Sequence, residues 1–191
     1  MDRPTQAADH YGEVVTNTIK TAGGYTHHAE DQLIRIVWSP PFKEFPFEIL
    51  NKSEYPIRIL WDEAAYVDAA DQTHRVMHSG IKFNHRNLSQ SPSVVAARGR
   101  LIHLLAPTDY ARFTQGLYGG WNQRTIFACV KGYTCNEEHQ RIALAHKGLA
   151  YRILLPIVVG SDTYPYTFTF NVNDVEIIKQ EPTTNVSEAQ R

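Results

Sequence analysis

The triplet Trp61-Asp62-Glu63 places two carboxylates side by side, the pattern from which a carboxylate dyad would be built. Side chains that follow one another along a strand point to opposite faces, so Asp62 and Glu63 form a dyad only if the strand bulges. The structural interpretation puts Trp61 in the core and lets Asp62 or Glu63 bind turn amides or pair with Arg75. The functional alternative is an acidic binding site at Asp62 and Glu63.

His74 and His78, four residues apart, are the second group that could do chemistry. With Asp62 they offer the imidazole and carboxylate ligands that zinc and related ions accept. On one strand, however, residues i and i+4 lie about 13 Å apart, too far for one ion unless the chain bends. We therefore predict structural histidines and no metal or other cofactor. The alternative is a metal-binding protein or metal-dependent enzyme built on Asp62, His74 and His78.

Support for nucleophilic catalysis is weak. No serine lies in a Gly-x-Ser-x-Gly segment, and the glycine-rich stretch 116–120 lacks the Lys-Ser/Thr of a phosphate-binding loop. Cys129 and Cys135 could form a thiol–imidazole pair with His139, close a small disulfide loop or remain two inert thiols. Their spacing alone does not decide between these states. We expect a protein that is not an enzyme.

Four aromatic residues around a glycine-rich stretch are the remaining candidates for binding: Tyr110, Phe113, Tyr118 and Trp121. Tyr and Trp anchor many interfaces because they supply a large contact area at a small cost in conformational entropy. One interpretation leaves these rings exposed for a partner. The other folds the segment back and buries them over one edge of the domain.

Length and composition limit the classes of protein to which the chain can belong. Its 191 residues suit one domain, and a hydrophobic content of 42% is enough for a core. A net charge of −1 argues against a nucleic-acid-binding protein, and no apolar run reaches the roughly 18–20 residues that span a bilayer. The first residues lack the apolar core of a signal peptide, so the protein is either cytoplasmic or exported with its signal removed.

Short strands separated by turn signals must position these candidate residues. Their spacing is typical of an antiparallel sandwich or barrel, and no strand–helix alternation indicates a parallel sheet. We predict a mainly β fold, an antiparallel immunoglobulin-like β-sandwich over residues 31–179, with a flexible arm at 1–30 and a disordered tail at 180–191. We also expect a long loop insert at 107–131 and one short helix at 136–146.

The segment from Phe45 to Gly80 carries a longer pattern: FPFEILNKS, then YPIRILWDEAAYVD, then HRVMHSG. With PTD at 107–109 and the ending LLPI…YTFTF, residues 31–178 resemble a group of uncharacterised bacterial envelope proteins, often predicted lipoproteins. The passage from strand through Asn-x-Ser to strand is also similar to the immunoglobulin-like sandwiches of the late-embryogenesis-abundant type.

The resemblance implies an exported protein of the periplasm or outer membrane, lipid-anchored through a cysteine that is missing here, since no lipobox is visible. It implies a disulfide between Cys129 and Cys135, and no known activity. We therefore expect a non-enzymatic envelope domain that binds an envelope protein or a surface component. We expect no nucleic acid as partner, and contact with the membrane only through the anchor. A structural subunit of an envelope assembly is the alternative.

Overall fold

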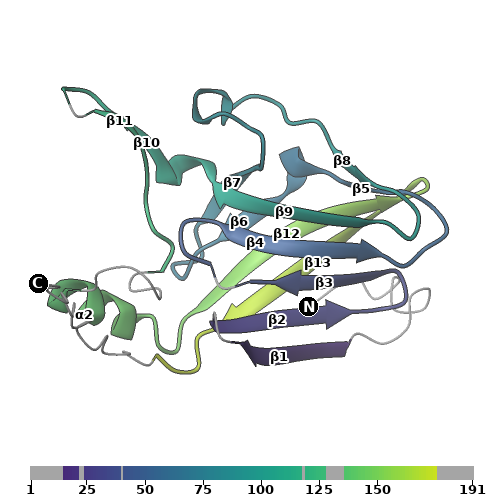
Figure 1. Cartoon of the computed structure of the whole chain (residues 1–191), viewed down its shortest axis with the longest axis horizontal. Helices are drawn as coiled ribbons and strands as arrows, with labels where there is room; N and C mark the ends of the chain where they lie inside the picture. The colour runs from purple at the N-terminus through teal and green to yellow at the C-terminus, as the bar shows by residue number, and fades with distance from the viewer. Residues whose placement is uncertain (1–14, 22–23, 40, 118, 128–135, 176–191) are drawn as a thin grey trace, which may run out of the picture.

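The computed structural model describes residues 15–21, 24–39, 41–117, 119–127 and 136–175, which form a mainly β fold (Figure 1). The described strands make one eleven-stranded sheet and a separate two-stranded sheet, and all their pairs are antiparallel. The elements are β1 (Val15–Thr21), β2 (Gly24–Glu30), β3 (Ile34–Trp38), β4 (Phe45–Asn51), β5 (Ile57–Ile59), η1 (Trp61–Glu63), β6 (Ala65–Val67), β7 (Thr73–His78), η2 (Phe83–His85), β8 (Ser93–Val95), β9 (Arg100–Pro107), η3 (Thr108–Tyr110), β10 (Ala111–Thr114), β11 (Gly120–Gln123), α2 (Glu137–Ala145), β12 (Ala150–Val159) and β13 (Asp162–Asn171).

The large sheet folds over into two layers that enclose the core. One layer runs β1-β2-β3-β4-β9, and the other contains β13, β12, β6, β5 and β8. In Figure 1 the strands β12 and β13 cross behind the first layer. Strand β7 belongs to both layers, because its residues 73–75 pair with β6 and its residues 76–78 pair with β9. The predicted antiparallel sandwich is thereby confirmed.

Alternation of apolar residues decides which face of each strand is buried. Every second residue of β4 from Phe45 to Asn51 is buried, the one-sided pattern that its sequence predicts. Trp38 of β3 packs against Phe168 of β13 across the core, with 5.2 Å between the ring centroids. Aromatic and β-branched side chains suit such a pleated surface, and they fill the space between the layers.

The register of β12 and β13 follows from the turn that joins them. Residues 160–161 form this turn, and Val159 lies opposite Asp162. Hydrogen-bonded and non-hydrogen-bonded pairs alternate from there, so Pro156 and Pro165 face each other in a non-hydrogen-bonded pair. Neither proline needs a backbone N–H toward its partner at that position, which explains how two prolines fit into one long hairpin.

The prediction of a flexible arm over residues 1–30 was wrong for its second half. Residues 15–30 form the β1–β2 hairpin, and β2 pairs with β3, so the hairpin extends the first layer. Thr, Asn and His dominate these strands, and Ala29 is the buried residue of β2. The hairpin is held by backbone pairing and buries few side chains. Its sequence therefore shows no clear apolar alternation from which the two strands could be predicted. Residues 1–14 and the predicted tail at 180–191 lie outside the described residues.

The predicted loop insert at 107–131 contains regular structure. After β9 the chain makes the turn η3 and then forms the β10–β11 hairpin. Gly116 in the connection has a φ of 125°, a conformation that L side chains rarely adopt. Gly116, one of the glycines in the predicted loop, therefore lies in the connection of a β-hairpin.

The helix prediction was confirmed. α2 begins after Asn136, whose side chain accepts a hydrogen bond from the His139 amide at 2.8 Å. This bond satisfies one of the free N–H groups at the start of the helix. Within the described residues, no helix has the length and apolar character needed to cross a membrane.

Candidate functional site

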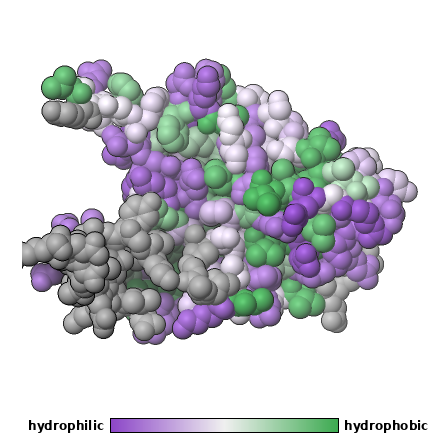
Figure 2. Space-filling view, viewed as in Figure 1, coloured by the Kyte–Doolittle hydropathy of each residue, from purple (hydrophilic) through white to green (hydrophobic). Residues whose placement is uncertain are grey.

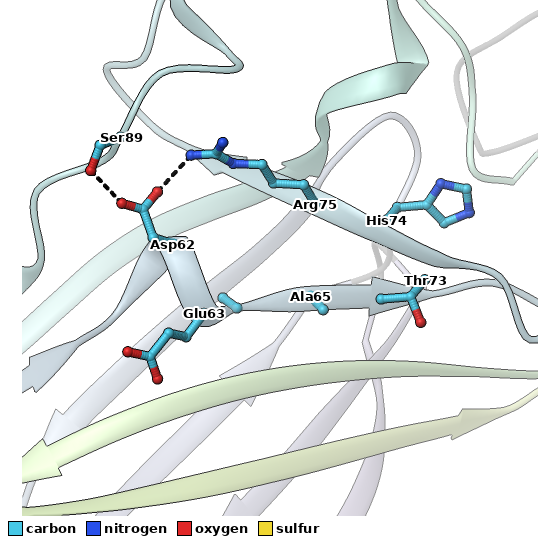
Figure 3. A pocket seen from close by; sticks show the side chains of 8 residues that line it. Asp62, Glu63, Ala65, Thr73, His74, Arg75 and Ser89 are labelled. Carbon is cyan, nitrogen blue, oxygen red and sulfur yellow. Dashed lines mark hydrogen bonds and ion pairs between the residues drawn. The ribbon is translucent and has the colours of Figure 1, made fainter.

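Asp62 and Glu63 lie in the 3-10 turn η1 rather than in a strand. The pairing of β5 ends two residues earlier, and the Ala64 amide donates to the Trp61 carbonyl at 3.2 Å. The buried Trp61 anchors this turn, since its indole Nε1 donates to Ser93 Oγ at 2.8 Å. Figure 3 shows the Asp62 and Glu63 side chains pointing in different directions, so they form no dyad.

Asp62 binds a strand and a loop at the same time (Figure 3). It accepts hydrogen bonds from the Ser89 hydroxyl, from Arg75 Nη2 at 2.6 Å and from the Gln90 amide at 3.1 Å. The Ser89 bond is the largest of the effects that hold the pKa of Asp62 below its ordinary value. The structural interpretation of Asp62, with a turn amide and Arg75 as partners, is confirmed.

Two partners of Asp62, Arg75 and Gln90, make further hydrogen bonds between β7 and the loop before β8. Arg75 donates to the carbonyl oxygens of Asn87 at 3.0 Å and Leu88 at 2.5 Å. The buried Gln90 side chain donates to the Val76 carbonyl at 2.7 Å. The cluster around Asp62 is therefore a joint between β7 and the loop before β8.

Replacing Asp62 by alanine should lower the free energy of unfolding by about 1–2 kcal/mol, because several bonds of a charged acceptor are lost at a half-exposed site. Urea denaturation followed by circular dichroism measures this effect. Glu63→Ala is the control, since Glu63 is exposed, and its effect should stay within about 0.5 kcal/mol. Equal effects of the two substitutions would contradict the structural role of Asp62.

His74 lies between two carboxylates on the other side of β7. Its Nδ1 is 2.8 Å from Asp109 Oδ2, and its Nε2 is 3.2 Å from Asp68 Oδ2. Burial lowers the pKa of His74, but the hydrogen bonds to Asp109 and Asp68 outweigh burial and raise it above the ordinary value. Figure 3 shows the ring turned away from Asp62.

His78 forms a pair with His103 of the neighbouring strand. His78 Nδ1 is 2.9 Å from His103 Nε2, and the His78 ring stacks on Trp61 with 4.7 Å between centroids. Burial lowers the pKa of His78, and burial together with the neighbouring His78 lowers the pKa of His103 to about 4. Both rings are therefore neutral at pH 7.

The structure separates Asp62, His74 and His78, the three residues of the metal alternative. Asp62 binds Arg75, His74 binds two aspartates and His78 binds His103, so the three candidates do not converge. The described ranges contain no group of three or more His, Cys, Asp or Glu side chains that could hold a metal ion. His74 and His78 are four positions apart on β7, and strand geometry places such positions too far apart to share an ion.

The pair of neutral histidines makes stability dependent on pH. Below about pH 6.5 the unfolded chain binds protons that the folded His78 and His103 do not, so the free energy of unfolding should fall as the pH drops toward 4. Urea midpoints at pH 7 and pH 4.5 measure this loss. His103→Gln removes one of these groups and should reduce the loss by about 1–2 kcal/mol. An unchanged loss in the variant would refute the assignment to His103.

Of the four aromatic candidates, Tyr110 fits the interpretation that buries these rings rather than the one that leaves them exposed for a partner. η3 turns it into the core, where it is 6% exposed. The Arg124 guanidinium lies over its ring at 4.6 Å. Tyr118 and the disulfide candidates Cys129 and Cys135 lie outside the described residues.

Phe113 and Trp121 are exposed together on the β10–β11 hairpin, which projects from the body of the protein (Figures 1 and 2). They lie opposite each other in the register, with 5.5 Å between ring centroids, and are 59% and 37% exposed. Leu117, between the two strands, is 93% exposed. Leu117 was not among the residues predicted from the sequence.

Residues from the η2 region support the hairpin. Phe83 lies 5.6 Å from Trp121 between centroids, and the Arg86 guanidinium lies over the same indole at 4.9 Å. The hairpin region is also basic, because residues 110–136 include Arg112 and Arg124 and contain no Asp or Glu. The structure thus presents a projecting surface made of apolar side chains and cations.

Comparison with protein-family models, curated proteins and solved structures found no match for this chain.

Proposed function

We propose that the protein is a non-enzymatic binding domain whose β10–β11 hairpin inserts into an apolar pocket on the acidic surface of a partner protein. The observation that carries this proposal is the exposure of Leu117, Phe113 and Trp121 on one projecting hairpin. Soluble proteins rarely leave such groups of apolar side chains uncovered without a binding role.

The type of residue on the hairpin supports binding to a protein. Trp, aromatic and Arg side chains carry much of the free energy in protein interfaces. The pairing of β10 with β11 fixes Phe113 against Trp121, and the Arg86 guanidinium also contacts the indole. Because these side chains are held before binding, less conformational entropy is lost when the complex forms.

Charge selects the kind of partner. Arg112 and Arg124 are exposed on the hairpin or beside it, and residues 110–136 contain no Asp or Glu. An acidic partner surface would be attracted to these cations, and salt would screen that attraction. The resemblance of residues 31–178 to envelope proteins supports a partner in the bacterial cell envelope.

Site-specific photo-crosslinking tests the proposal. Benzoylphenylalanine in place of Leu117 should crosslink to one protein in irradiated cells. The crosslinked peptide of that partner should come from an acidic part of its surface. The same probe in place of Tyr55, which is 69% exposed on a distant loop, is the control and should give no such product. No crosslink at Leu117, or identical products from both positions, would contradict the proposal.

A further inference from the structure

A groove of about 590 Å³ lies between the β1–β2 hairpin and β3 on one side and β13 on the other. Its apolar side is built by aromatic rings: Trp38 lies 5.2 Å from Phe168 and 5.7 Å from Phe170 between centroids. His27 of β2 meets Phe170 edge-on at 5.5 Å. Thr and Asn residues of β1 and β13 line the rest. A volume of this size is typical of a binding groove.

β13 borders this groove with a free edge. Among the described strands it pairs with β12 alone. In the register that sets Pro156 opposite Pro165, the backbone groups of Thr167, Thr169 and Asn171 point away from β12. A row of unpaired N–H and C=O groups is a template for a further strand.

The lining of the groove is aromatic and polar. No Asp, Glu, Lys or Arg is among its lining residues in the described part of the chain. Burial, and next the neighbouring His28, lower the pKa of His27, so this ring is neutral at pH 7. A charged occupant would lose its hydration without gaining a counter-charge, so the groove favours a neutral one.

Trp38 supplies an independent observation. Its side chain is 2% exposed, and its indole N–H has no hydrogen-bond partner among the described residues. Buried indole N–H groups normally have one. Trp38 is a lining residue of the groove, so an occupant that brings an acceptor oxygen, such as a backbone carbonyl, could satisfy this donor.

We propose that this site binds an extended, uncharged peptide, which adds to β13 as an antiparallel strand and places its apolar side chains in the groove. Peptide residues opposite Thr167, Thr169 and Asn171 exchange backbone hydrogen bonds with the edge. The residues between them lie opposite Phe168 and Phe170, so their side chains face the groove. In strand addition the main chain supplies affinity and the alternate side chains supply specificity.

A designed peptide tests each part of this geometry. The probe is a labelled peptide of alternating threonine and valine, with lysine at both ends for solubility, and its binding is followed by fluorescence anisotropy. With valine in the groove, the threonine N–H groups face β13. N-methylation of the threonines should weaken binding at least about tenfold, whereas N-methylation of the valines should leave it within about twofold.

Two proline variants test the same edge from the side of the protein. Thr169→Pro removes an N–H that points out of the sheet beside the groove, and it should weaken binding about tenfold. Thr163→Pro removes an outward N–H of the same strand away from the groove and should have little effect. Circular dichroism melting confirms that both variants fold.

Absence of binding by the unmodified peptide would overturn the proposal. So would equal affinities of the two N-methylated peptides, a result that does not depend on whether the proline variants fold. None of these changes touches the β10–β11 hairpin, so their failure and the failure of the proposed function are distinguishable.

Discussion

Replacing Phe113 and Trp121 together by serine should weaken binding of the partner protein about 100-fold or more. Each exposed aromatic ring of this kind can contribute about 2 kcal/mol or more at the centre of an interface, and the two rings form one surface. Titration of the crosslinked partner, once purified, measures the affinity. Because Phe113 and Trp121 are both exposed, the free energy of unfolding should change by less than about 1 kcal/mol.

The matched control for this substitution is Tyr55→Ser, which removes an exposed aromatic ring from a loop far from the hairpin. It should leave the affinity unchanged. Raising the salt concentration should weaken binding by the unaltered protein, since the hairpin region is basic. An affinity that survives the loss of Phe113 and Trp121 would show that the partner binds elsewhere.

The largest expected effect on stability comes from Asn51→Asp. Asn51 is fully buried, and its Nδ2 donates to the carbonyl oxygens of Tyr55 at 2.7 Å, Ala96 at 3.0 Å and Val95 at 3.2 Å. An aspartate has nearly the same shape, but when ionised it has no N–H to donate. Its carboxylate would face three carbonyl oxygens inside the protein, so we expect a loss of about 3 kcal/mol or more.

Urea denaturation at several pH values distinguishes this cause from a packing defect. The penalty of Asn51→Asp should shrink as the pH falls, because a protonated carboxyl can donate again. Ser53→Ala is the control: it removes one hydroxyl that donates to Asn51 Oδ1 at 2.8 Å and should cost about 1 kcal/mol. A penalty that is small at neutral pH, or independent of pH, would count against the donor role of Asn51.

The sequence predicted those elements whose apolar residues recur with a clear period. β4 and β13 are examples, because buried residues recur at every second position of β4 and at Tyr166 and Phe168 of β13. β12 was predicted from a nearly continuous apolar run instead, and its residues 155–158 are all buried. The β1–β2 hairpin was missed, since its Thr and His side chains are half-exposed and carry no such signal. The turn at Trp61 was missed because the apolar alternation is misleading there. It continues from Ile57 and Ile59 to Trp61, although β5 ends at Ile59.

The candidate site was predicted in part. Phe113 and Trp121 were singled out from their types and from the glycines around them, and the structure leaves both rings exposed. Tyr110 has the same residue type, but whether it is buried depends on η3, which local composition does not indicate. Arg86 reaches Trp121 from another element, a contact over 35 positions of the chain that no pattern in this single sequence reveals.

The sharing of β7 between both layers has a consequence for cooperativity. Its residues 73–75 pair with one layer and its residues 76–78 with the other, so a local opening of this strand breaks the pairing with β6 and with β9. Neither layer can lose this strand while the other keeps its full pairing. We therefore expect the sandwich to unfold as one unit rather than as two layers that separate one after the other.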